Sequence, residues 1–409
     1  MSPGIPRSTA VRIFLSFAGA YFLSYALRSV NAALAPLLAS DLNLSAGELG
    51  WLSSAYFLAF AMMQLPLGIS LDRHGARRTE SALLLVAAVG ALIVSLGHSL
   101  WVLSVGRILI GMGVASCLMA PYAYYRRCFP ARRQPQLAMW MLVAGTTGAL
   151  VATEPALALA EWIGWRSFFL LAAVLLAMAA VAIFLWAGDH DRQPAPSSSG
   201  PQATSFISLI SHPAMVRVIP TTIFLSGAFG ALQSLWAGPW MTEVLLMTPE
   251  QAGRTLLVFN AALLVSYVTM SVVSPWLEKR GVSLARQSMV AFLWFTACML
   301  LMILWHTPGS WVLWLVLAPC VPAVILVQTQ TALAFPREIA GRILTTFNLV
   351  MFTGAFSIQW GIGLLVDLFQ STGIARGHSL MLAFLCLVVM QVFSLLWFFI
   401  RRPVVVEKD

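Results

Sequence analysis

Charged side chains are scarce in this sequence. They make up 10% of its 409 residues, whereas about a quarter of the residues of an average soluble domain are charged. Hydrophobic residues account for 60% of the chain, and its mean hydropathy is +0.86. The shortage of charge therefore argues against a soluble domain and indicates an integral membrane protein.

Several signatures of energy-coupled and catalytic proteins are also missing. Lysine occurs only as Lys279 and Lys408, and no Gly-x-x-x-x-Gly-Lys-[Ser/Thr] motif is present, which argues against ATP-driven pumping by this chain. The sequence contains no His-Glu-x-x-His motif, no clustered metal ligands and no recognisable pairing of a nucleophile with a base. The five cysteines lack zinc or disulfide-framework spacing. We therefore expect no enzyme activity, no metal and no bound cofactor.

Long apolar segments fill most of the chain. A helix needs about 20 apolar residues to cross the hydrocarbon core of a bilayer. We predict an all-α membrane protein with twelve transmembrane helices, near residues 12–38, 49–71, 80–98, 101–124, 137–160, 166–187, 215–239, 251–276, 287–305, 309–334, 343–368 and 379–400.

Basic residues gather at alternate ends of these segments. If the N-terminus lies inside, the outer side holds only Arg166, Arg254 and Arg376. The inner side then holds Arg7, Arg12, Arg73, Arg77, Arg78, Arg126, Arg127, Arg132, Arg133, Arg192, Arg217, Lys279, Arg280, Arg286, Arg337, Arg342, Arg401, Arg402 and Lys408. Because cytoplasmic loops carry an excess of Lys and Arg, we expect both termini to be cytoplasmic, in the inner membrane of a bacterium. Basic loops at the surface of the lipid membrane then account for the net charge of +9, and no nucleic-acid partner is needed to explain it.

The chain divides into two halves. Residues 188–205 are rich in Pro, Ser, Gly and charge, which is typical of a flexible linker. The stretch Gly68–Gly75 matches Ser274–Gly281 in spacing and character, and helix-start pairs occur at corresponding places, as Ser45 with Glu48 and Thr248 with Gln251. Such a repeat indicates a duplicated six-helix unit. We predict two pseudo-symmetric six-helix bundles and a cytoplasmic linker, over residues 1–187, 215–409 and 188–214.

The segment GISLDRHGARR, from Gly68 to Arg78, resembles the signature loop of the major facilitator superfamily. The segments GRILIGMG from Gly106 and GWRSFF from Gly164 resemble two further patterns of that family. The resemblance implies secondary active transport of a small-molecule substrate by alternating access, and a gating role for Gly68, Asp72, Arg73, Gly75, Arg77 and Arg78. Charges between two helix ends can lock bundles in one state, and a glycine permits the tight turn. The alternative is a basic turn that only sets topology.

Arg28 lies within the first apolar segment, about 20–25 Å from the flanking charges Arg12 and Asp41. A central arginine costs roughly 2.5–3.5 kcal/mol on insertion scales, so it needs a partner or a watery cavity. Tyr25 and Asn31 lie three residues before and after it, on the same helix face. We predict that Arg28, with Tyr25 and Asn31, binds substrate, because guanidinium fits carboxylate and phosphate. The alternative is a structural pair with Glu154.

The stretch YALRSVNAALAP, around Arg28, resembles the first span of the organic-anion branches of the superfamily, the organophosphate and anion–cation symporter groups. That resemblance implies an anionic substrate held by Arg28. The organophosphate group expects a second arginine in the seventh span, whereas this chain has Gly230 and Ala231 there, with Gln233 nearby. A singly charged or zwitterionic solute fits this pattern better than a phosphate clamped by two arginines.

Glu154 lies within the fifth predicted span and is followed by Pro155. Proline removes a backbone donor, so we expect a kink there, and a carboxylate in a membrane can take up a proton. Glu154 and Arg107 lie at similar depth, and we predict a proton-coupling ion pair between them. The alternative is a static pair that staples two helices.

Polar side chains in the second half could line a cavity, and we select Gln233, Trp236 and Gln359 as substrate-binding residues. Amides in membrane helices also join neighbouring helices, which is the alternative for each of them. We expect the site to lie between the halves near the bilayer midplane.

Three functions fit these features. The first is the proton-gradient-driven import of a small organic anion or zwitterion by a monomeric transporter. The second is a proton-antiporting exporter of drugs or metabolites, although the exporter pattern in the fifth span is incomplete here. The third is a non-transporting sensor or scaffold, against which the signature loop and the charges expected in the cavity argue.

Overall fold

A computed structural model describes residues 6–130, 133–188, 206–322, 326–328, 330–331, 335 and 340–401. Most of the predicted linker lies outside these residues, and so do five basic residues used for the orientation: Arg132, Arg192, Arg337, Arg402 and Lys408. The described part of the chain is helical and contains no strand.

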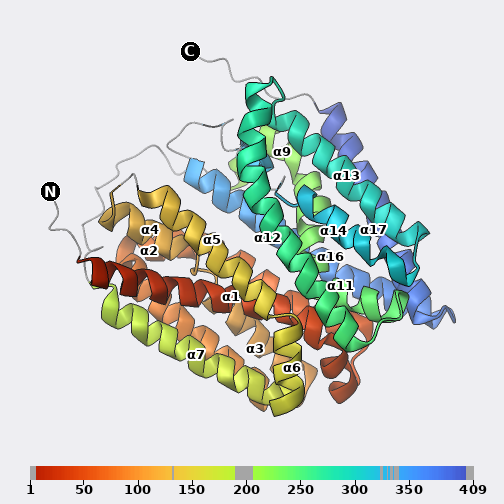
Figure 1. Cartoon of the computed structure of the whole chain (residues 1–409), viewed down its shortest axis with the longest axis horizontal. Helices are drawn as coiled ribbons and strands as arrows, with labels where there is room; N and C mark the ends of the chain where they lie inside the picture. Colours follow the sequence, from red (N-terminus) through yellow and green to blue (C-terminus); the bar gives the residue numbers. More distant parts are fainter. Residues whose placement is uncertain are drawn as a thin grey trace. The chain divides into compact units, whose positions relative to one another are not determined.

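The chain forms two compact units (Figure 1), each described by itself below. The first contains residues 1–42 and 55–200, and the second contains residues 43–54 and 201–409. The helices of the first unit are α1 (Arg7–Leu42), α2 (Ala46–Leu96), α3 (Leu100–Gly113), α4 (Met119–Cys128), α5 (Gln134–Val151), α6 (Glu154–Ile163) and α7 (Trp165–Trp186). The start of α2, through Ser54, is grouped with the second unit.

The second unit begins with a long, irregular helical stretch and continues with longer helices. The first stretch comprises α8 (Phe206–Ile210), α9 (Pro213–Thr221), η2 (Thr222–Gly227), α10 (Ala228–Ala231), η3 (Leu232–Trp236), α11 (Ala237–Pro239) and η4 (Trp240–Val244). The remainder comprises α12 (Pro249–Lys279), α13 (Leu284–Leu304), η5 (Pro308–Trp311), α14 (Val312–Leu317), η6 (Ala318–Cys320), α16 (Ala340–Ser371) and α17 (Arg376–Ile400).

Eight helices in the described residues are long and apolar enough to cross a membrane, or nine if α5 and α6 form one bent span. The prediction of twelve is therefore confirmed only in part. One reason is that α2 runs through two predicted spans and changes direction only at Gly75. Another is that α3 and the helical stretch Pro308–Cys320 are short. The chain is a multi-pass membrane protein, and the exact count of twelve and the cytoplasmic termini stay predictions.

Local sequence signals explain where several helices start and bend. Both helix-start pairs are confirmed: the Ser45 hydroxyl and the Glu48 carboxylate bond each other's backbone N–H groups, and Thr248 and Gln251 do the same. Gly75 has φ 76°, a conformation that glycine adopts without the steric cost of a side chain. The predicted kink near Pro155 is also present, as a 50° bend between α5 and α6.

Small residues allow the helices of the first unit to pack closely. The helix α1 lies against both α5 and α7 (Figure 1). A Cβ atom at Gly145 would lie 2.5 Å from the Tyr21 ring, and one at Gly148 would meet the main-chain carbonyl of Phe22. The α1–α5 contact therefore depends on glycine, and it fixes the face of α1 that carries the tyrosines.

Candidate functional site

Arg28 lies among aromatic rings in the interior of the first unit. Its guanidinium carbon is 4.5 Å from the ring centroid of Tyr25 and 5.2 Å from that of Phe60. The Tyr25 ring in turn packs edge-on against Tyr21, with centroids 5.0 Å apart. The predicted polar face of α1 is therefore present, with Asn31 buried one turn further on. Arg28 itself is half-buried.

A second arginine shares this interior. Arg107 of α3 is 2% exposed, donates a hydrogen bond of 3.1 Å to the Leu27 carbonyl, and places its guanidinium carbon 5.3 Å from the ring centroid of Tyr56. Tyr56 of α2 is fully buried. We call Arg28 and Arg107 the guanidinium pair, because Arg107 bonds the main-chain carbonyl of Leu27, the residue directly before Arg28.

The predicted ion pair between Arg107 and Glu154 is not formed. Within the described part of the chain, Arg107 has no carboxylate at ion-pair distance, and its Nε has no hydrogen-bond acceptor. The estimate of equal depth assumed straight spans, whereas Glu154 begins α6 directly after the 50° bend, and Arg107 is directed to α1 and α2. A role of Glu154 and Arg107 in proton coupling stays a prediction.

The selected polar residues of the second unit contact one another or their neighbours. Gln233 donates to the Asn260 side chain at 2.9 Å. The Trp236 indole N–H donates to the Gln359 main-chain carbonyl at 2.9 Å, and the Gln359 side chain accepts from Ser234 at 2.9 Å. These contacts have the geometry expected for amides that join helices. Substrate contact by Gln233, Trp236 and Gln359 stays a prediction.

The signature loop, residues 68–78, holds the ends of several helices of the first unit together. Asp72 lies 3.7 Å from Arg127 of α4. The Arg77 Nε donates to the Phe184 carbonyl of α7 at 2.6 Å, and its guanidinium carbon lies 4.3 Å from the Phe184 ring centroid. Gly68, Arg73 and Arg78 are exposed. The loop therefore links α2 to α4 and α7, and its gating role stays a prediction.

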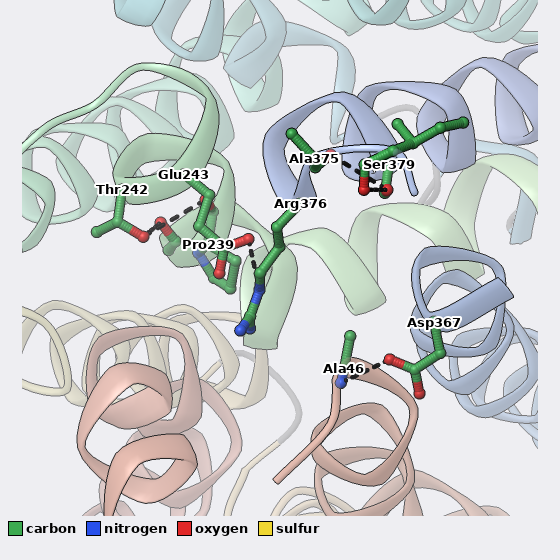
Figure 2. A network of polar contacts seen from close by, with 10 residues as sticks. Ala46, Pro239, Thr242, Glu243, Asp367, Ala375, Arg376 and Ser379 are labelled. Atoms are coloured by element: carbon green, nitrogen blue, oxygen red, sulfur yellow. Dashed lines mark hydrogen bonds and ion pairs between the residues drawn. The ribbon is translucent and has the colours of Figure 1, made fainter. Parts of the chain in front are cut away.

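Sequence inspection missed a polar cluster in the second unit. The Asp367 carboxylate of α16 accepts from the Ser45 hydroxyl at 2.8 Å and from the backbone N–H groups of Ala46 and Gly47 at 3.0 and 2.8 Å. Nearby in the same view, Arg376 of α17 forms an ion pair of 2.9 Å with Glu243 of η4 (Figure 2). The only hint in the sequence is that each of these charges lies at the end of an apolar segment.

The described residues contain no group of three or more His, Cys, Asp or Glu side chains that could hold a metal ion. The interior around Arg28 presents two guanidinium groups and several tyrosines. Such a set can bind and orient an anion through charge-assisted hydrogen bonds.

Comparison with known proteins places the chain in a family. A family model described as Major Facilitator Superfamily matches residues 17–359. Among curated proteins, the multidrug resistance protein MdtL of Escherichia coli (strain K12 / DH10B) is 26% identical over 270 residues, which cover 59% of this chain and 67% of MdtL. The MdtL of Shigella dysenteriae serotype 1 (strain Sd197) matches with the same identity and coverage.

Several solved structures share the fold. A bacterial homologue of the human lysosomal transporter Spinster superposes with a TM-score of 0.79 at 16% identity, covering 98% of this chain and 97% of that one. The D-xylose–proton symporter superposes with a TM-score of 0.72 at 15% identity, covering 96% and 98% of the two chains. At these identities the likeness concerns the fold alone.

Proposed function

The chain belongs to the Major Facilitator Superfamily, and on this premise we propose that it is a secondary active transporter of a small organic anion or zwitterion, driven by a proton gradient through alternating access. The observation that carries the proposal is the guanidinium pair inside the first unit, where Arg107 bonds the main-chain carbonyl directly before Arg28. We further propose that it acts as a monomer in the inner membrane of a bacterium.

Electrostatics favours an anion at this place. A buried cation is costly unless a counter-charge or hydrogen-bond acceptors compensate it. Arg107 is almost fully buried, and its Nε has no acceptor among the described residues. A carboxylate beside Arg28 would bring negative charge to both guanidinium groups. Guanidinium also presents its donors in a planar fork, which matches the two oxygens of a carboxylate.

The guanidinium pair also contains a second arginine, which the seventh predicted span lacks. The seventh predicted span offers no charge near Gln233, but Arg107 of α3 supplies a second cation from the first unit. Arg28 is half-buried and Arg107 buried. We therefore assign direct substrate contact to Arg28, with Tyr25 beside it, and assign long-range attraction to Arg107.

The second candidate function is proton-antiporting export of drugs or metabolites. The similarity to MdtL, a protein named for multidrug resistance, favours it. Against it stands the charge of the site, because many drugs are cations and would be repelled by two arginines. The aromatic rings around Arg28 could still receive a flat, neutral molecule.

Thermal stability of the purified protein tests the choice, because a ligand that binds the native state raises Tm by mass action. The panel contains carboxylates, amino acids, peptides and cationic drugs, and the variants are Arg28→Gln and Arg107→Gln. The matched control is Arg217→Gln, because Arg217 is also half-buried, lies 3.9 Å from the Phe398 ring centroid and belongs to the second unit. We expect a carboxylate to raise Tm of the wild type and of the control, but not of Arg28→Gln.

Other results would change the assignment. If cationic drugs raise Tm equally in the wild type and in Arg28→Gln, the arginine is structural and the exporter is favoured. If the control loses the carboxylate response together with Arg28→Gln, the response reflects general destabilisation and the anion site is wrong.

A further inference from the structure

Glu80 is a buried acid that the site described above does not use. It lies in α2, five residues beyond the kink at Gly75, which corresponds to about 7.5 Å along the helix. Glu80, Leu84, Ala87 and Ala91 are each 0% exposed and recur every three to four residues. They therefore form the face of α2 that packs inside the first unit, and the carboxylate is on that face.

The surroundings of Glu80 offer it little compensation for a negative charge. Neither carboxylate oxygen has a hydrogen-bond partner within the described residues. The titratable groups that interact with it are the Cys117 thiol, from the connection between α3 and α4, and Tyr125 of α4. Cys117 comes close enough to interact electrostatically, although the pair does not reach hydrogen-bond geometry. No basic side chain of the described residues forms an ion pair with Glu80.

The helix α3 connects the face that carries Glu80 to the guanidinium pair. A Cβ atom at Gly113 of α3 would meet the main chain of Leu83 and Ala87, one to two turns along α2 from Glu80. Arg107 lies six residues before Gly113, about 9 Å along the axis of α3. A change of charge at Glu80 would be felt at the guanidinium pair across a water-poor interior, where electrostatic interactions are strong.

We propose that Glu80 carries a proton in this state of the transporter, and that losing the proton weakens anion binding by the guanidinium pair. An ionised carboxylate buried without a partner is so costly that such a group takes up a proton instead. When the chain rearranges and water reaches the site, the O–H bond of the acid breaks, and the proton leaves to water. The anionic form then offsets part of the positive charge that attracts the substrate.

This inference rests on the proposed function and makes it more specific. Proton and anion would favour each other's binding, because coupling between two sites is reciprocal. Such mutual stabilisation favours the transport of both in the same direction. It also assigns the role of proton carrier to Glu80, which is fully buried, instead of Glu154, which is half-buried at the bend between α5 and α6.

Infrared spectroscopy of the lipid-reconstituted protein tests the proton without any substrate. A protonated carboxylic acid has a carbonyl stretching band that shifts in D₂O. We expect this band in the wild type and in Glu154→Gln, and its loss in Glu80→Gln. Glu80→Asp should keep the band at a shifted frequency, which covers the case that the glutamine variant does not fold. An identical band in the wild type and in Glu80→Gln would overturn the proposal.

Succinate, used as the anion probe, tests the coupling. In the wild type and in Glu154→Gln we expect the apparent affinity, measured from the shift in Tm, to fall about tenfold from mildly acidic to mildly alkaline pH, within the usual range of coupling. Glu80→Gln should keep the tighter affinity throughout, because it mimics the protonated acid. Because succinate itself ionises further over this range, each variant is compared with the wild type at the same pH, where the ionisation of succinate is identical. An unchanged pH dependence in Glu80→Gln would show that the acid is not coupled to the anion site.

The two experiments separate this inference from the function on which it rests. If the band is lost in Glu80→Gln but neither succinate nor the other anions raise Tm of the wild type, Glu80 carries a proton and the proposed anion site is wrong. Stabilisation by succinate with an unchanged band would retain the anion and reject Glu80.

Discussion

The carboxylate of Asp367 holds the first turn of α2, and its removal should open that turn. The substitution is Asp367→Ala, which deletes three acceptor contacts of 2.8 to 3.0 Å, from the Ser45 hydroxyl and the N–H groups of Ala46 and Gly47. The first N–H groups of a helix have no acceptor within the helix. The two backbone donors are also buried, so water cannot fully replace the carboxylate.

The size of the effect follows from these contacts. Hydrogen bonds to a charged group contribute about 1.5–3 kcal/mol each, and loss of a helix N-cap costs about 0.5–2 kcal/mol. Asp367 is half-exposed, and solvent screening lowers the sum. We therefore expect the free energy of opening the turn to fall by about 2 kcal/mol, which is roughly a 30-fold change in the opening equilibrium.

Amide hydrogen exchange at Ala46 and Gly47 measures this opening directly. The control is Glu250→Ala at the start of α12, where the carboxylate forms an exposed ion pair of 2.6 Å with Arg254. Exposed pairs contribute about 0.2–1 kcal/mol, so exchange near Glu250 should rise less than about fivefold. If Asp367→Ala raises the exchange rates of Ala46 and Gly47 no more than Glu250→Ala raises those at the start of α12, the Asp367 carboxylate does not hold the first turn of α2.

Three further predictions follow from the packing. Gly75→Ala should lower Tm by a few degrees, because a residue with a side chain adopts φ 76° and ψ 169° only at a cost of about 1–3 kcal/mol. The control Gly68→Ala, where a Cβ atom would meet nothing within 4 Å, should leave Tm nearly unchanged. Equal shifts in Tm for the two variants would contradict this. Gly148→Val should abolish the monodisperse peak in gel filtration, because its side chain would meet a main-chain carbonyl of α1. Glu243→Gln and Arg376→Ala each break one partly buried ion pair. The loss of Tm in the double variant should therefore be smaller than the sum of the two single losses, by the equivalent of about 1 kcal/mol. Additive losses would show that the ion pair contributes nothing.

Local patterns predicted the features that depend on neighbouring residues. The helix-start pairs at Ser45 and Thr248, the turn at Gly75 and the bend at Pro155 all follow from chemistry within a few residues, and all are present. The face of α1 that carries Arg28 also follows from helical spacing alone. These features form wherever the segment forms a helix.

Contacts between distant segments could not be predicted in this way. Asp367 and Ser45 are 322 residues apart, and nothing in either segment names the other. Arg107 was matched with Glu154 by depth, but the direction of a side chain around its helix decides its partner, and depth carries no such information. Glu80 was overlooked because it follows a run of charged loop residues, and only the packed structure shows that it is buried.

The membership of α2 in both units has a consequence for dissecting the protein into fragments. The natural place to cut the chain is near residue 200, which is also the boundary between the two compact units. A cut there leaves residues 43–54 on the first fragment, although they pack with the second unit. The isolated second fragment would therefore lack the helix start that Asp367 holds. We expect that fragment to need the first one, co-expressed in the same membrane, to reach its native fold.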